Sequence, residues 1–198
     1  MNPSSERVSY KINEFSANVG TEVKRLQAQV ELFWDKELKV YLYFGLKDGM
    51  KILECGSGPG YVMEKIISHF PNSYVVGLEA DPYLVEISKK NLQEKELSHY
   101  EVVHQSIMNI EFPENSFDFV VTRLVLEHLP DPSAAVKEVY RVLRPGGKAV
   151  FIDNDFPVFA VPVAAVAAAP GALAAIPAVV DTVGTRAGVL GGGGRWQA

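Results

Sequence analysis

The sequence predicts an α/β domain whose sheet is doubly wound, mostly parallel and covered by helices on both faces. Short apolar runs alternate with helical patterns across residues 49–155, and a glycine-rich segment, Gly56–Gly60 (GSGPG), follows the first run. Two later helices open with the pair Asp-Pro, in which the aspartate caps the helix and the proline fits its first turn. Apolar strands separated by helices of this length are typical of a parallel sheet with helices on both sides.

Each element of this sheet follows from a local pattern. The first strand runs into the glycine segment, and the second ends in an acidic residue, Glu79. The strands expected are Met50–Cys55, Tyr74–Glu79, Tyr100–His104, Phe117–Thr122 and Lys148–Asp153. The helices expected between them are Tyr61–Phe70, one capped by Asp81 and one capped by Asp131, and residues 144–147 (RPGG) are expected to form a turn.

An amphipathic helix precedes the sheet. Apolar residues recur at helical spacing after Thr21, which is a candidate cap, and the pattern continues to about Leu38. We expect this helix to pack on the edge of the domain. The predicted organisation is a helical cap over residues 1–48 and a ligand-binding core over residues 49–155.

Composition argues against several classes of function. The 198 residues suffice for one domain with a core, and the net charge of -5, with no basic patch, gives no support for nucleic-acid binding. The single cysteine, Cys55, lies in a predicted strand, so we expect a buried thiol and a reducing compartment. Residues 1–7 lack the apolar core of a signal peptide, and the expected location is the cytoplasm.

The composition changes abruptly after residue 155. Residues 156–198 contain no Lys, Glu, Asn, Ser, Tyr, His, Met or Cys and consist mostly of Ala, Val, Gly and Pro. We interpret this tail as non-native or disordered, from a frameshift, a fusion or a designed extension, with a low-complexity native tail as the alternative. Its prolines and alanines argue against a membrane-spanning helix over residues 156–180. The tail offers one good strand candidate, Ala178–Val183, so the C-terminal part of the sheet is expected to be incomplete.

The glycine loop and two carboxylates predict a ligand site. The loop glycines let the backbone approach a ligand, and Glu79 can accept hydrogen bonds from two ribose hydroxyls. A dinucleotide site has the spacing G-x-G-x-x-G, whereas this chain has G-x-G-x-G, with Tyr61 in place of the third glycine. Glu54 puts a negative charge beside the loop, which favours a ligand that carries an ammonium group over one that carries a phosphate.

With these motifs, residues 20–155 resemble the class I methyltransferases that use S-adenosylmethionine (SAM), of the small-molecule, UbiE/menaquinone-methyltransferase-like type. The resemblance implies a Rossmann-like domain with SAM as cofactor, no metal, and a small-molecule acceptor methylated at oxygen, nitrogen or an activated carbon. It also implies an antiparallel strand pair that finishes the sheet and an N-terminal helix that covers the cofactor, with Arg25 and Gln29 as candidate contacts. The cofactor contacts that it implies are Glu54, Gly56, Ser57, Gly58, Gly60, Glu79, Ala80, Ser106, Ile107 and Arg123.

The resemblance also implies a role for the main contact residues. Glu54 would hold the ammonium of the methionine part of SAM, and Glu79 would hold the ribose. Where relatives often have an aspartate for the adenine amino group, this chain has Ser106, which is a shorter and uncharged acceptor. Ile107 would pack on the adenine face, and Arg123 would offer a backbone contact.

His128 and Asp153 are the candidate catalytic residues. An imidazole titrates near neutrality, which suits a general base, and a histidine that caps or packs a helix is the alternative. Asp153 ends the fifth strand, where open α/β sheets bind ligands. It would orient the substrate or assist His128, and a solvated loop acid is the alternative.

Two functions follow from these patterns. The first is a SAM-dependent methyltransferase, and the second is a truncated or frameshifted fragment that binds SAM without catalysing transfer. An NAD-dependent oxidoreductase is disfavoured by the glycine spacing and by Tyr61. The patterns do not fix the oligomeric state or the acceptor.

Overall fold

The computed structural model describes residues 18–155, 161–168, 189–190 and 196–197, with side chains over residues 18–153. Its main sheet contains β1 (Lys51–Cys55), β2 (Tyr74–Glu79), β3 (Tyr100–His104), β4 (Phe117–Arg123), β5 (Leu143–Asp155) and β6 (Val161–Ala168). Two short strands, β7 (Val189–Leu190) and β8 (Trp196–Gln197), pair with each other. The helices are α2 (Val19–Tyr43), α3 (Tyr61–His69), α4 (Pro82–Glu94) and α5 (Pro132–Val142), with a short 3-10 helix, η1 (Leu126–His128).

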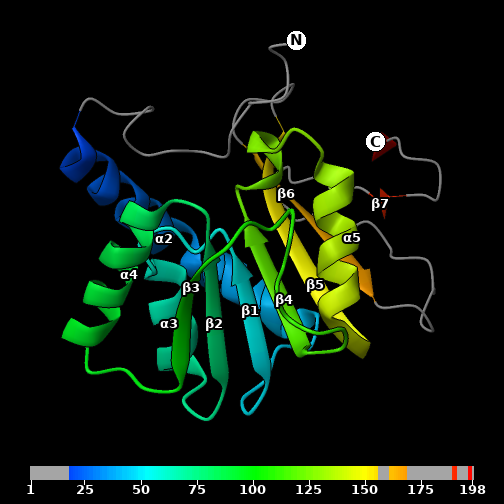
Figure 1. The fold of residues 1–198 in the computed structure, drawn as a ribbon, viewed down its shortest axis with the longest axis horizontal. Coiled ribbons are helices and arrows are strands. Elements are labelled where there is room, and N and C mark those ends of the chain that lie inside the picture. Colours follow the sequence, from blue (N-terminus) through cyan, green and yellow to red (C-terminus); the bar gives the residue numbers. More distant parts are fainter. Residues whose placement is uncertain (1–17, 156–160, 169–188, 191–195, 198) are drawn as a thin grey trace.

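The main sheet has the strand order β3-β2-β1-β4-β5-β6 (Figure 1). Strands β1 to β5 are all parallel to their neighbours, and β6 runs antiparallel to β5. The predicted α/β class with a doubly wound, mostly parallel sheet is therefore confirmed.

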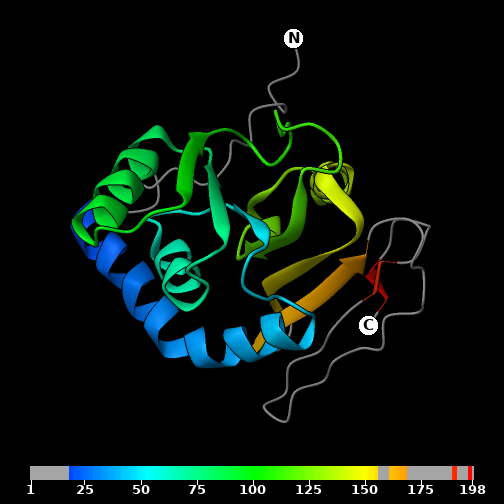
Figure 2. The ribbon, with the colours of Figure 1, turned by 90° about the horizontal axis from the view of Figure 1, so that it is seen from below.

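Helices cover both faces of this sheet, as expected. Helices α2, α3 and α4 lie on one face and α5 lies on the other (Figure 2). Neighbouring residues of β1 serve separate cores, because Ile52 packs with the first group of helices and Leu53 packs with α5. In the part of the chain that the structure describes, no helix is long and apolar enough to cross a membrane.

Helix α2 begins before and ends after the predicted boundaries. Asn18 is the cap, and its side-chain oxygen accepts a hydrogen bond from the backbone N–H of Thr21 at 3.1 Å. The helix extends to Tyr43 because its apolar stripe continues as far as Tyr41, whose side chain is fully buried. The prediction of Thr21 as the cap and of an end near Leu38 was wrong.

Strand β5 starts earlier than expected. Its pairing with β4 moves from Phe117 opposite Leu143 to Phe119 opposite Lys148, so residues 144–147 form an irregularity inside the strand where a separate turn was expected. Gly146 has a φ of +82° there, a conformation that favours glycine. The glycine-dependent bend at residues 144–147 was predicted correctly, but the pairing of Leu143 with β4 before this bend was not predicted.

Strand β6 is an antiparallel strand at the edge of the sheet, as the family resemblance implied, although no local pattern in residues 161–168 predicted it. It pairs along the edge of β5, from Lys148 opposite Ala168 to Asp155 opposite Val161. Its residues are mostly alanine and valine without polar alternation, and Pro162 lacks a backbone donor, so the local pattern is weak. The other predictions for the tail, including the strand candidate Ala178–Val183, lie outside the described residues.

The order of the strands creates a crevice at their carboxyl ends. β1 is flanked by β2, with Cys55 opposite Leu78, and by β4, with Cys55 opposite Thr122. The chain leaves β1 toward α3 on one face and leaves β4 toward α5 on the other. Open α/β sheets bind their ligands where the connections diverge in this way.

Candidate cofactor site

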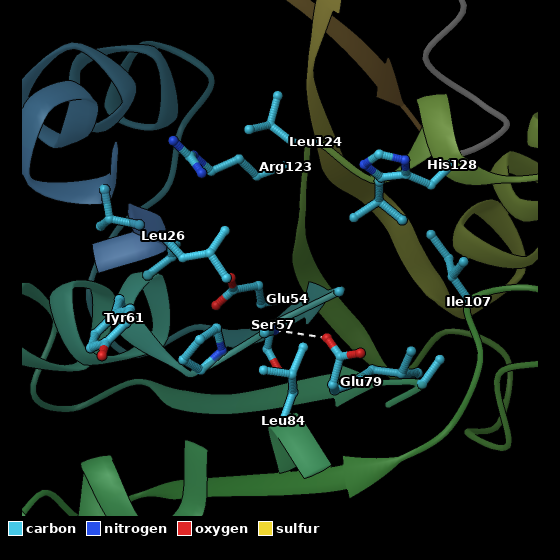
Figure 3. A pocket seen from close by; sticks show the side chains of 18 of the residues that line it. Leu26, Glu54, Ser57, Tyr61, Glu79, Leu84, Ile107, Arg123, Leu124 and His128 are labelled. Atoms are coloured by element: carbon cyan, nitrogen blue, oxygen red, sulfur yellow. Dashed lines mark hydrogen bonds between the residues drawn. The ribbon is translucent and has the colours of Figure 1, made fainter. Parts of the chain in front are cut away.

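A cavity of about 410 Å³ lies at this crevice. Its walls come from the glycine loop, the ends of β2 and β4, the N-terminal half of α2, and η1 (Figure 3). Gly60 and Asp153 are not among the residues that line it. The other predicted site residues all line the cavity: Glu54, Gly56, Ser57, Gly58, Glu79, Ala80, Ser106, Ile107, Arg123 and His128, together with Arg25 and Gln29.

The loop glycines have three different tasks. The backbone N–H groups of Gly56 and Ser57 donate to the carbonyl oxygen of Leu78 at 2.7 and 3.1 Å, which folds the loop over the end of β2. A Cβ at Gly60 would lie 2.4 Å from the side-chain oxygen of Ser88, so this glycine permits close packing against α4. A Cβ at Gly58 would meet nothing within 4 Å, and this glycine leaves space on the cavity wall.

Glu79 joins the loop to the start of α4. Its Oε2 accepts from the backbone N–H of Gly58 at 2.8 Å, and its Oε1 accepts from the backbone N–H of Asp81 at 2.8 Å. Burial raises the pKa of the Glu79 carboxyl, and these backbone donors oppose the shift. Each carboxylate oxygen has a second lone pair, so Glu79 can also accept hydrogen bonds from ligand hydroxyls.

Glu54 is buried at the floor of the cavity, with only 2% of its surface exposed. Its Oε2 has no hydrogen-bond partner among the described residues. Burial raises the pKa of this carboxyl well above its usual range, although the Arg123 guanidinium acts in the opposite direction. A buried carboxylate oxygen without a partner is costly, and a cationic ligand group would satisfy it.

The Arg123 side chain makes an ion pair that the sequence analysis did not anticipate. Its Nε donates to both carboxylate oxygens of Glu37, at 2.8 and 3.0 Å, and both side chains are more than nine-tenths buried. Figure 3 shows the Arg123 side chain extending toward α2, the helix that carries Glu37. Arg123 was expected to contribute its backbone, but its guanidinium fastens α2 to the end of β4.

Ser106 and Ile107 lie on a short turn after β3. The side-chain oxygen of Ser106 accepts from the backbone N–H of Met108 at 3.2 Å, and Ile107 is buried against the core while also lining the cavity. The turn is held from α5, because Glu138 accepts from the backbone N–H of Ile110 at 3.0 Å. A hydroxyl oxygen has two lone pairs, so Ser106 retains the capacity to accept a second hydrogen bond.

His128 and Asp153 occupy different positions around η1. The His128 side chain is about one-third exposed and lines the cavity, with its Nε2 3.6 Å from Oε1 of Glu127. Oδ2 of Asp153 accepts from the backbone N–H of Glu127 at 3.3 Å, so Asp153 helps to hold the segment that carries the histidine. Leu124, which precedes this segment and also lines the cavity, has a φ of +55°, which is strained for leucine.

Two residues of α2 bear on the site, and one of them, Glu37, was not expected. Glu37 lies on the buried stripe of the helix, seven residues after Val30 and three after Trp34. A charged residue on an otherwise apolar stripe was the sequence pattern that could have identified it. Gln29, which was expected to contact a ligand, lines the cavity, and its Oε1 is buried with no partner among the described residues.

The fold and cavity define an α/β domain of the nucleotide-binding class, with the ligand site at the point where the strand order reverses. Residues 53–151 match the family model described as Methyltransferase domain. The chain belongs to this family.

Comparisons with individual proteins agree with this assignment. The demethylmenaquinone methyltransferase of Geobacillus sp. (strain WCH70) is 34% identical over 87 residues, which are 44% of this chain and 37% of the relative. The sterol 24-C-methyltransferase of Aspergillus fumigatus is 38% identical over 104 residues, which are 52% and 27% of the two chains. The match therefore spans less than two-fifths of either curated relative.

A solved structure shares the fold at larger coverage. The crystal structure of a SAM-dependent methyltransferase from Aquifex aeolicus superposes with a TM-score of 0.62 and is 27% identical. The similarity covers 68% of this chain and 72% of that chain.

Proposed function

We propose that this protein is a SAM-dependent methyltransferase that acts on a small molecule at oxygen, nitrogen or an activated carbon. The observation that carries the proposal is the pair of buried glutamates around the glycine loop. Glu79 accepts from the backbone of the glycine loop and would bind the ribose, and Glu54 presents a carboxylate oxygen with no partner among the described residues. Family membership and the Aquifex structure support the same cofactor.

The residues of the cavity fit SAM at each of its three parts. Glu79 can accept from both ribose hydroxyls, and Glu54 can accept from the ammonium of the methionine part. Ile107 offers an apolar surface for the adenine, and Ser106 lies beside it with a hydroxyl. The open space at Gly58 lets the ligand approach the backbone.

SAM supplies a methyl group that its sulfonium has already activated for transfer. The task of the chain is therefore to hold the acceptor in line, and positioning of this kind contributes on the order of 7–11 kcal/mol. Leu26 and Leu124 provide apolar walls from α2 and from the residue that follows β4. His128 is placed at the same cavity and would take the proton from an acceptor that must lose one.

The apolar walls also support an apolar acceptor. Leu26, Leu124 and Leu129 line the same cavity as His128. Two relatives are named for demethylmenaquinone and sterol substrates, which are apolar small molecules. In this proposal α2 is the cap of the cofactor-binding core, and the single buried thiol of Cys55 suits a reducing compartment such as the cytoplasm.

A domain that binds SAM without transferring methyl groups is the second candidate. The observation that favours it is the length of the match, which spans 37% and 27% of the two curated relatives. The match does not extend over the rest of either relative.

Transfer of labelled methyl from SAM to a panel of quinols, sterols and amines tests the proposal. We expect at least one acceptor to be labelled. For an acceptor that must lose a proton, His128→Gln lowers turnover by about 10²–10⁴-fold, because the general base is lost. His69→Gln, on the exposed end of α3, is the matched control and leaves turnover unchanged. Unchanged turnover in His128→Gln would assign His128 a packing role, and no labelling by a protein that binds the cofactor would favour the second candidate.

A further inference from the structure

A cluster of three charged side chains lies at the floor of the cavity, and two of them, Glu54 and Arg123, line it. Glu37 comes from α2, Glu54 from β1 and Arg123 from β4, and all three are almost completely buried. The cluster contains two carboxylates and one guanidinium, so its formal charge is negative when both carboxylates are ionised. Tyr41 lies beside Glu37 and stays neutral, because burial raises the pKa of its phenol well above its usual range.

Glu54 and Arg123 share one face of the sheet. Glu54 pairs with Val121 in the register of β1 and β4, and Arg123 follows Val121 by two residues, which places both side chains on the face covered by α2. In another side-chain conformation, directed toward β1, the Arg123 guanidinium would therefore face the carboxylate of Glu54.

The guanidinium is instead committed to Glu37. Nε of Arg123 donates to both carboxylate oxygens of Glu37, at 2.8 and 3.0 Å, while Oε2 of Glu54 has no partner among the described residues. Removing one partner of a buried ion pair leaves an uncompensated buried charge, so Arg123 depends on a carboxylate partner at this position. The arrangement leaves a carboxylate oxygen of Glu54, a residue that lines the cavity, without a partner among the described residues.

We propose that Glu37 determines the ligand specificity of the cavity by holding Arg123 away from Glu54. The open carboxylate of Glu54 then selects a ligand that carries a cationic group at this end. The proposal rests on the proposed function, since the amino-acid part of SAM supplies such a group. Glu37 does not touch the ligand in this account, and it acts through the position of Arg123.

Removal of the Glu37 charge gives a specific expectation. In Glu37→Gln the guanidinium is no longer bound by a carboxylate of α2, and it pairs with Glu54. The cluster is then neutral without a ligand, and a cationic group no longer gains a buried ion pair. A ligand without a cationic group would not distinguish the two proteins.

Three ligands separate these effects in calorimetric titrations of the full chain. S-adenosylhomocysteine carries both the amine and the carboxylate, its decarboxylated form keeps only the amine, and methylthioadenosine has neither. We expect Glu37→Gln to weaken binding of both amine-bearing ligands by about tenfold or more, and to leave methylthioadenosine unchanged. Glu86→Gln, on the exposed face of α4, removes the same charge and serves as the control, with no change for any ligand.

A double variant guards against loss of structure in the single one. Glu37→Gln combined with Arg123→Gln again leaves Glu54 as the unneutralised carboxylate, so the preference for amine-bearing ligands should return. Equal weakening of all three ligands by Glu37→Gln would mean that Glu37 only holds α2 in place, and would overturn the proposal. Tighter binding of S-adenosylhomocysteine alone would also overturn it, because Arg123 would then bind the ligand carboxylate. If the wild-type protein bound none of the ligands, the proposed function itself would fail.

Discussion

At the scale of single residues, two buried glutamates of the cavity differ in the hydrogen bonds that their carboxylate oxygens accept. Glu79 receives backbone hydrogen bonds from Gly58 and Asp81, each at 2.8 Å, and these donors stabilise its charge. Glu54 is as deeply buried, but its Oε2 has no partner among the described residues. Burial raises the pKa of both carboxyls, and it raises the pKa of Glu54 well above the usual range of a glutamate.

The raised pKa of Glu54 predicts a pH dependence of stability. Between the ordinary pKa of a glutamate and the raised pKa of Glu54, the folded chain keeps a proton that the unfolded chain has released. The free energy of unfolding of the ligand-free protein therefore falls as pH rises through this window, by at most about 1.4 kcal/mol per pH unit from this group.

Urea unfolding of the wild type and of Glu54→Gln, at mildly acidic and at neutral pH, measures this contribution. The variant lacks the group, so its stability relative to the wild type should improve as pH rises. The difference between the two proteins removes the effect of all other titrating groups. A difference that is independent of pH would show that Glu54 titrates normally in the folded state.

The candidate site was predictable from the sequence where local motifs carry it. The glycine loop, Glu54 and Glu79 follow from spacing after two apolar runs, and the structure brings them together at one cavity. Glu37 was missed because its partner Arg123 is distant in sequence and approaches it only through the packing of α2 on the sheet. The helical pattern places Glu37 on the buried stripe of α2, but it does not identify Arg123 as its partner.

At the scale of elements, the predictions held where the signals are local. Asp81 and Asp131 cap α4 and α5 as expected, with their side chains accepting from the backbone N–H groups of Tyr83 and Ala134 at 2.9 and 3.0 Å. The resemblance implied an antiparallel strand here, but the local pattern did not locate β6, because its formation depends on the free edge of β5. A strand of this kind is defined by its partner, which a local pattern does not contain.

The glycine loop offers a matched pair of substitutions. Gly58 has a φ of +53° and Gly146 a φ of +82°, and an added Cβ would meet nothing within 4 Å at either position. Gly58 lines the cavity, whereas Gly146 lies at the start of β5, away from it. Each change to alanine should cost about 1–2 kcal/mol of stability, because an L-residue is strained at positive φ.

Only Gly58→Ala should also weaken ligand binding, because its methyl group would occupy the space in which the ligand approaches the backbone. Chemical unfolding measures the two stability losses, and calorimetry with S-adenosylhomocysteine measures the affinities. Equal affinities in the two variants would place the ligand away from the loop.

At the scale of the whole molecule, function depends on where the strand order reverses. The reversal between β1 and β4 puts the glycine loop, Glu79 and η1 around one cavity although they are far apart in the sequence. This arrangement follows from the alternation of strands and helices, which is why the fold class could be predicted. The contributions of α2 and η1 to the cavity wall were harder to predict, because these elements reach it through long-range packing.

The central claim is that this cavity binds SAM through Glu79, and calorimetric titration with S-adenosylhomocysteine tests it most directly. We expect binding by the wild type and a loss of at least about tenfold in Glu79→Ala, because a buried carboxylate that accepts from the ribose is removed. Glu101→Ala, on the exposed side of β3, removes the same charge as a control and should bind as the wild type does. Circular dichroism verifies that all three proteins are folded. A folded wild type that does not bind, or a Glu79→Ala variant that binds equally well, would contradict the account.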